Sequence, residues 1–223
     1  MPYAAFDPDC DVLTAADSHD LARIAAESEK PGLIVFGWRF SNLRQAAVLP
    51  TRIRTLKISG APSLTSLDGI QALQELREFV LMTPTGSSGA RRLIKVASFA
   101  PLERLAHLER LLIHEVRPDD LDLSPIARMT ELRDVDISGV PEFGIEEYAR
   151  LAVALPSAKG RCLQPYFTIK GVGYCKKCKG QMVLLVGAPP RSRRFLCPQA
   201  NQKLLAAHVA KWEQVTVRRF TEI

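Results

Sequence analysis

Apolar residues recur along the chain with a period of two inside short segments. Four segments place apolar side chains at their first, fourth and sixth positions: Ile53–Ile58, Leu76–Leu81, Leu108–Ile113 and Leu132–Ile137. This alternation predicts strands that bury every second side chain. A fifth segment, Leu33–Val35, is a degenerate form of the same pattern. The equivalent positions are 23, 23, 32 and 24 residues apart, at Leu33, Leu56, Phe79, Leu111 and Val135.

The apolar period changes to three after the strands. It holds over Leu64–Leu76, Phe99–Leu108 and Leu123–Leu132, and is typical of a helical or 3₁₀ return. A strand and its return form one turn of a solenoid. Neighbouring turns must stack, because no single turn can bury its own apolar face. The pattern therefore predicts an α/β solenoid of about five turns with a parallel sheet.

The segment Leu64-Thr-Ser-Leu67-Asp-Gly-Ile70-Gln-Ala-Leu73-Gln-Glu-Leu76 resembles the return of the short, about 22–24-residue leucine-rich repeats of bacterial internalin-like proteins. The resemblance covers roughly residues 31–156 and implies a concave parallel sheet. The chain departs from the family where an asparagine usually follows the strand, because these positions are Ala61, Pro84, Val116 and Val140. The departure implies an irregular solenoid without the asparagine ladder. The alternative is that the leucines form the core of another α/β fold.

Three domains are expected from these patterns. Residues 1–30 form an N-terminal cap that contains a helix over 17–27, with Asp17 or Ser18 as its N-cap. Residues 31–158 form the solenoid, and a helix over 144–155 closes its last turn. Residues 159–223 form a small basic appendage.

The outward side chains of the strands are expected to line the concave face and to bind a protein partner. The middle column across the strands is apolar at its centre and charged at its ends. The candidate partner-binding residues are Trp38, Lys57, Glu78, Val80, Met82, Arg110, Leu112, His114, Asp134 and Asp136. Phe36 and Trp38 would extend this surface as aromatic anchors. A solvated face without a partner is the alternative. The glycine- and serine-rich stretch 83–92 is either a binding loop or a tolerated insertion.

The appendage carries cysteines with metal-ligand spacing. Cys175 and Cys178 form a CxxC pair, Cys197 follows an apolar strand over 182–186, and the arrangement resembles a zinc ribbon. The family's fourth cysteine position is Ala200 here. His208, in an expected helix over 201–212, is the candidate fourth ligand of a structural zinc ion. The alternatives are a ribbon that has lost its metal, a redox CxxC pair and a metal site open to water.

Charge is divided unevenly along the chain. Residues 1–158 hold 17 basic and 22 acidic residues (net −5), whereas residues 159–223 hold 13 and 2 (net +11). This basic charge is suited to contact either nucleic-acid phosphates or an acidic protein neighbour. The basic residues are Lys176, Lys177, Lys179, Arg191, Arg193, Arg194, Arg218 and Arg219, with Tyr174 and Phe195 available for stacking.

The remaining sequence features narrow the class of function. Five cysteines, an acidic N-terminus and the lack of a long apolar run indicate a cytoplasmic protein without a membrane segment. No phosphate-binding, serine-hydrolase or zinc-protease motif occurs, and no small-molecule substrate is evident. We therefore expect a non-enzymatic, bacterial-type protein-binding module. The resemblance admits a toxin-neutralising immunity protein. The alternatives are a nucleic-acid-associated adaptor acting through residues 159–223 and a zinc-dependent enzyme.

Overall fold

The computed structural model describes residues 8–14, 17–83, 93–168, 174–176, 178–188 and 196–217. The chain folds as two compact units, unit 1 over Met1–Val140 and unit 2 over Pro141–Ile223. The change in charge at residues 158/159 therefore falls inside unit 2. The expected closing helix also belongs to unit 2.

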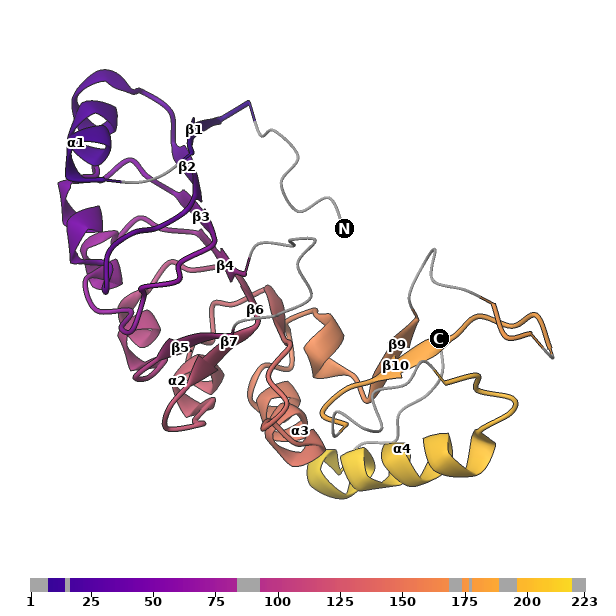
Figure 1. Ribbon diagram of the computed structural model, residues 1–223. Helices are drawn as coiled ribbons and strands as arrows, with labels where there is room; N and C mark the ends of the chain where they lie inside the picture. The colour runs from indigo at the N-terminus through magenta and orange to yellow at the C-terminus, as the bar shows by residue number, and fades with distance from the viewer. Residues whose placement is uncertain are drawn as a thin grey trace. The chain divides into compact units, whose positions relative to one another are not determined.

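Unit 1 is built on a six-stranded sheet in which every neighbouring pair of strands is parallel (Figure 1). Its strands, in sheet order, are β1 (Cys10–Leu13), β2 (Gly32–Phe36), β3 (Thr55–Ser59), β4 (Glu78–Met82), β6 (Arg110–His114) and β8 (Asp134–Ser138). The positions expected to be equivalent lie opposite one another across five strands, from Leu33 through Leu56, Phe79 and Leu111 to Val135. The register read from the apolar spacing is thus confirmed.

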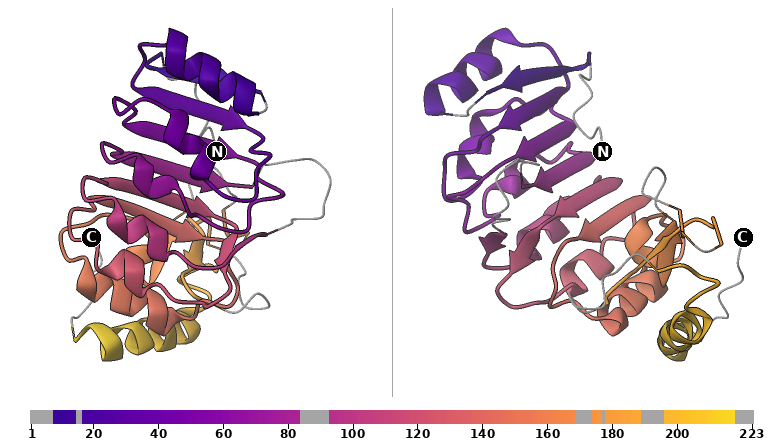
Figure 2. Two further views of the ribbon diagram at one scale, coloured as in Figure 1. Left: turned by 90° about the vertical axis from the view of Figure 1, so that its left-hand side faces the viewer. Right: turned by 45° about the vertical axis from the view of Figure 1, so that its right-hand side comes forward.

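The helical segments that connect the strands lie on one side of this sheet (Figures 1 and 2). They contain α1 (Ser18–Glu27), η1 (Arg44–Val48), η2 (Ile70–Ala72), η3 (Ala100–Arg104) and α2 (Ser124–Ala127), where η denotes a 3₁₀ helix. The residues of the three-residue period are buried against the inner face of the sheet, as at Leu67, Leu102 and Ile126. Two short parallel strands, β5 (Ile94–Val96) and β7 (Val116–Pro118), form a second sheet in unit 1.

The N-terminal segment differs from the cap that the sequence suggested. β1 pairs with β2 in parallel and extends the sheet to a sixth strand, and α1 follows it as a helical return. Gly32 permits this pairing, because a Cβ atom there would lie 2.2 Å from the Cys10 Sγ. Asp17 is the N-cap of α1, since its carboxylate accepts the Asp20 N–H at 2.9 Å. The strand escaped sequence analysis because it has four residues and no clear alternation.

Backbone hydrogen bonds join successive turns of unit 1 at the start of each strand. The Arg54 carbonyl accepts the N–H groups of Arg77 and Glu78, and the Arg77 carbonyl accepts those of Glu109 and Arg110. Ala61, Val116 and Val140, which replace the asparagines of the expected ladder, are buried apolar side chains. Pro84 lies outside the described residues. In the described part of unit 1, backbone bonds and apolar contacts therefore stand where the asparagine ladder was expected.

Unit 2 combines helices with a small antiparallel sheet. Its elements are α3 (Ile145–Ala154), η4 (Arg161–Leu163), β9 (Tyr166–Thr168), β10 (Val183–Leu185) and α4 (Gln202–Thr216). β10 pairs with β9 and is bridged to Leu196, so the hairpin region is held to the segment that precedes α4. Buried side chains of β10, of α4 and of the segments between them form a common cluster: Val183, Leu185, Ala188, Leu196 and Leu205. Among the described residues, no helix is both long and apolar enough to span a membrane.

Candidate functional site

The face of the main sheet opposite the helical returns is the first candidate site, and we call it the front face. It carries the outward side chains of the strands. In strand order these form three columns across β3, β4, β6 and β8: Thr55, Glu78, Arg110 and Asp134; Lys57, Val80, Leu112 and Asp136; Ser59, Met82, His114 and Ser138. The structure thus brings nine of the ten candidate partner-binding residues together on one face.

A chain of charges of alternating sign crosses the front face. The Glu78 carboxylate lies 3.4 Å from the Lys57 Nζ and 3.4 Å from an Arg110 guanidinium nitrogen. Arg110 also donates from Nε to Asp134 at 3.0 Å. We call these four residues the charge ladder. Alternating charges satisfy one another across neighbouring strands and favour the observed register.

The two halves of the charge ladder differ in exposure. The side chains of Lys57 and Glu78 are 18% and 17% exposed, whereas those of Arg110 and Asp134 are 48% and 46% exposed. Solvent screens the second pair more strongly, so it contributes less to stability. That half, on β6 and β8, presents charges that an incoming molecule can reach.

The apolar centre of the front face is less accessible than the sequence suggested. Val80 and Leu112 are 5% and 8% exposed, although alternation directs them outward. They lie in register between Lys57 and Asp136, and adjacent strands are only about 4.8 Å apart, so neighbouring side chains cover them. The expectation that these two residues form an exposed apolar patch is therefore wrong.

Trp38 is not an exposed anchor. Its side chain is fully buried, and its indole N–H donates to the Asn42 carbonyl at 2.9 Å. The ring of Phe40 packs against it edge-on, with 5.4 Å between the ring centroids. Phe36, at the end of β2, is 39% exposed and is the aromatic residue of this region that a partner can contact.

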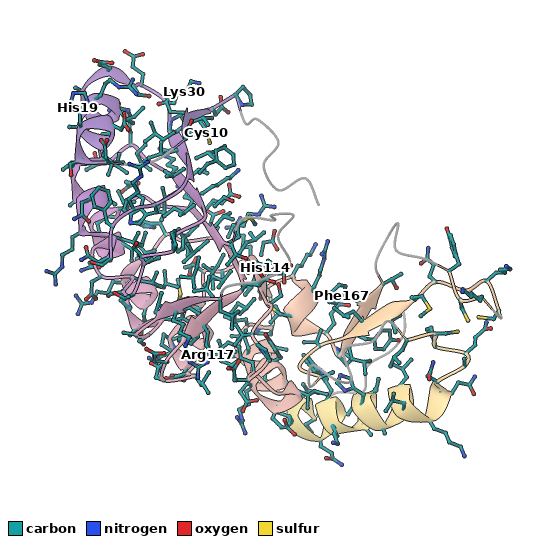
Figure 3. The ribbon with its side chains drawn as sticks, viewed as in Figure 1. Cys10, His19, Lys30, His114, Arg117 and Phe167 are labelled. Atoms are coloured by element: carbon teal, nitrogen blue, oxygen red, sulfur yellow. The ribbon has the colours of Figure 1, made fainter. Side chains whose placement is uncertain are left out.

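A polar cluster borders the front face at the ends of β6 and β8. The His114 Nδ1 lies 3.0 Å from the Ser138 hydroxyl, and Glu115 accepts a hydrogen bond from the Thr83 hydroxyl. Glu115 is buried, and its φ of +58° lies in the left-handed region. Figure 3 labels His114 in this part of unit 1. The stretch 84–92, a candidate binding loop, lies outside the described residues.

Glu115 is a feature that sequence analysis missed. The residues directly after β2, β3 and β8 are Gly37, Gly60 and Gly139, and all three have positive φ. Glu115 takes the same place after β6, where a side chain strains the backbone. Comparison of the repeats would have identified Glu115 as unusual, because glycine occupies the equivalent positions after β2, β3 and β8.

The second candidate site is a group of three cysteines in unit 2. The Sγ atoms of Cys175, Cys178 and Cys197 all lie within 4.8 Å of one another, and those of Cys178 and Cys197 are 3.2 Å apart. Backbone N–H groups of Gly180 and Ala200 donate to the sulfurs of Cys178 and Cys197, each at 3.4 Å. We call this group the cysteine centre.

The backbone around the first two cysteines forms a tight knuckle. The Lys179 N–H donates to the Cys175 carbonyl and the Cys175 N–H donates to the Gly180 carbonyl, both at 2.9 Å. Lys179 has a φ of +60°, which turns the chain back on itself. Hydrogen bonding to Cys197 raises the pKa of the Cys178 thiol above its usual range. The Gly180 N–H acts in the opposite direction, because it favours the thiolate.

His208 is not part of the cysteine centre. Its Nε2 lies 3.0 Å from the Pro165 carbonyl. Among the described residues, only the three cysteines form a group that could hold a metal ion. Burial lowers the pKa of His208 and favours the neutral ring, which donates to this carbonyl. The expected Cys₃His site is therefore corrected to a group of three cysteines. The spacing of eleven residues after Cys197 did not reveal that the middle of α4 faces β9.

Few of the basic residues proposed to contact nucleic acid can be placed. Lys176 and Lys179 are exposed beside the cysteine centre, as is Tyr174. The six remaining basic candidates and Phe195 lie outside the described residues: Lys177, Arg191, Arg193, Arg194, Arg218 and Arg219. Within unit 2, the guanidinium of Arg161 lies 5.4 Å from the ring centroid of Phe167, which Figure 3 labels.

Comparison with known proteins adds little to this geometry. No protein-family model matches the chain, and no curated protein matches it significantly. Among solved structures, an internalin from Listeria monocytogenes matches with a TM-score of 0.30 and 16% sequence identity. The match covers 57% of this chain and 39% of the internalin. At this TM-score the likeness assigns no function, so the description of the fold rests on the strand register.

Proposed function

We propose that the protein is a non-enzymatic binding module that recognises a protein partner through the front face. The observation that carries the proposal is the charge ladder, which places four ionised side chains across four adjacent strands of a rigid sheet. Residues held by strands are positioned more exactly than residues on loops, and they do not need to be ordered on binding.

The exposed half of the charge ladder is the proposed contact region. Arg110 and Asp134 are about half exposed, and His114 lies in the neighbouring column with its side chain 41% exposed. Charged groups at such a surface select a partner of complementary charge and accelerate its association. We therefore expect the partner to present a polar surface that carries both an acidic side chain, opposite Arg110, and a basic side chain, opposite Asp134.

The class of module that we propose is a leucine-rich repeat protein with turns of uneven length. Its support is the apolar period of two and three, together with the parallel register of the strands. The resemblance to small solitary repeat proteins implies one class of partner, a toxin that this protein would neutralise by binding it. The identity of the captured protein tests this role.

The test is a quantitative pull-down from a lysate of the source organism with two matched variants. Arg110→Gln/Asp134→Asn neutralises an ion pair on the front face. Glu103→Gln/Arg128→Gln neutralises an ion pair on the side of the helical returns, where two hydrogen bonds of 2.7 and 2.8 Å join the side chains. Each variant removes one positive and one negative charge, so the net charge is unchanged.

A partner of the front face is expected to be lost from the first variant and retained by the second. Circular dichroism must show that both variants fold like the wild type. Retention of every captured protein by both variants would contradict the assignment of the front face. Equal loss from both variants would do the same.

We also propose that the cysteine centre holds a structural zinc ion. Its support is the approach of three thiols in a knuckle whose backbone N–H groups donate to sulfur, the environment that thiolate ligands favour. Zinc binding would stabilise this small segment, because the ion draws together two parts of unit 2. Metal analysis of protein purified without chelator tests the proposal. We expect one zinc ion in the wild type and in Cys10→Ser, and a large loss in Cys178→Ser.

A further inference from the structure

The cysteine centre supplies three ligands, whereas a structural zinc site needs four. All five cysteines and all four histidines of the chain lie within the described residues. Among those residues, no histidine, carboxylate or further cysteine joins Cys175, Cys178 and Cys197. His208, the expected fourth ligand, is engaged with the Pro165 carbonyl. A zinc ion held here therefore has one coordination position that these side chains do not fill.

The spacing of the three sulfurs suits a tetrahedral ion. Zn–S bonds of about 2.3 Å at tetrahedral angles separate the sulfurs by about 3.8 Å. The separations in the structure, 3.2 Å for Cys178 and Cys197 and at most 4.8 Å for each pair, bracket this value. Small movements of the side chains would accommodate the ion.

The surroundings of the cysteine centre are exposed on the side of the knuckle. Tyr174 is 69% exposed, and Lys176, Lys179 and Ala200 are also exposed. Ala200 occupies the place at which a second knuckle would supply a cysteine, and its methyl group offers no donor atom. The side of the cysteine centre that these described residues line is therefore the side from which a small molecule would approach a metal ion.

Basic residues near the cysteine centre offset the negative charge that an anionic fourth ligand adds. A zinc ion with three thiolates has a net charge of −1, and a fourth thiolate makes it −2. Lys176 lies two residues before Cys178 and Lys179 directly follows it. Both belong to a segment with a net charge of +11 over residues 159–223, which offsets this negative charge. Thiolate is also a donor that zinc prefers in four-coordinate sites.

We propose that the zinc ion of the cysteine centre binds a small anionic thiol from solution as its fourth ligand. This inference rests on the proposed zinc site. In the binding step the thiol releases its proton to solvent, its sulfur forms a bond to zinc, and a bound water molecule leaves. No electrons are transferred. The centre would thus act as a reversible receptor for a small thiol, for which glutathione is a suitable probe.

The test uses the full chain loaded with Co²⁺, whose absorption reports the number and type of its ligands. The protein is kept reduced with a phosphine, which adds no thiol, and is then titrated with glutathione. We expect the sulfur-to-cobalt absorption to rise by about a third as a fourth thiolate joins three. The neutral thiol 2-mercaptoethanol should give the same final spectrum at a higher concentration, because it lacks the carboxylates that the lysines attract.

The variant Ala200→Cys is the matched control, because it introduces a fourth cysteine at the position where the zinc-ribbon family has one. Its cobalt spectrum should show four thiolates without added thiol and should not change with glutathione. If wild-type protein binds cobalt but its spectrum is insensitive to glutathione, the open position is refuted and the metal site stands. If only Ala200→Cys binds cobalt, the wild-type chain has lost its metal site and both proposals fail.

Discussion

Neutralisation of Glu78 tests whether the charge ladder stabilises unit 1. The Glu78 carboxylate has two cationic neighbours, and each closest N–O distance is 3.4 Å. With an effective dielectric constant of about 20, each contact has a gross Coulomb energy of about 5 kcal/mol. Desolvation of the charges offsets most of this energy, and the half-exposed Arg110 is screened by solvent. We therefore expect Glu78→Gln to lower the free energy of unfolding by about 1–2 kcal/mol.

The measurement is urea unfolding followed by tryptophan fluorescence. Trp38 lies in unit 1 and Trp212 in unit 2, and both are buried. All variants should therefore carry Trp212→Phe, so that the fluorescence reports unit 1 alone. Glu78→Lys should cost more than Glu78→Gln, because it places a third cation beside Lys57 and Arg110.

Glu103→Gln provides the contrast that can refute this reasoning. Its pair with Arg128 has shorter contacts than Glu78 has, and the Arg128 guanidinium lowers the pKa of Glu103 by hydrogen bonding. Its side chains are nevertheless well exposed, so we expect a smaller loss of stability than for Glu78→Gln. A loss for Glu103→Gln as large as that for Glu78→Gln would show that distance, not burial, determines these contributions. A change below about 0.3 kcal/mol for Glu78→Gln would show that the ladder does not stabilise the sheet.

Three further predictions concern the interior of each unit. Gly69→Ala should lower the free energy of unfolding in urea by about 2 kcal/mol or more, because φ is +101° and the new Cβ would lie 2.3 Å from the Arg44 backbone. A decrease below about 0.5 kcal/mol would contradict this close approach. Phe79→Ala should cost about 3–5 kcal/mol in the same assay, because Phe79 is fully buried in the centre of the sheet, and Phe79→Leu should recover much of the loss. His208→Gln should reduce the acid sensitivity of unit 2. Burial lowers the pKa of His208 in the folded protein, so the unfolded chain takes up a proton at higher pH than the folded chain does. The free energy of unfolding therefore decreases as the pH falls below about 6.5. The unfolding temperatures of wild type and His208→Gln, both measured in the presence of a metal chelator at about pH 7.5 and about pH 5.5, test this prediction. An equal decrease of the unfolding temperature in both proteins would exclude His208 as the source of the acid sensitivity.

Most of the fold of unit 1 follows from the sequence alone. The periods of two and three are local properties, because they depend only on how side chains alternate along a strand or a 3₁₀ helix. Stacking of repeated units then aligns equivalent positions, so the spacing from Leu33 to Val135 also determined the register. The same reasoning located the three cysteines, since a CxxC pair and a third cysteine after a strand are local signals.

The tertiary structure decided which of these side chains a partner or a metal ion can reach. Val80 points outward by alternation, yet it is only 5% exposed in its place between Lys57 and Leu112 of the neighbouring strands. Trp38 lies two residues after the exposed Phe36, yet its ring is buried and hydrogen-bonded. His208 lies on a helix that packs with β10, and the Pro165 carbonyl engages it. Burial and coordination depend on residues far away in the chain, and the local periods of the sequence do not contain that information.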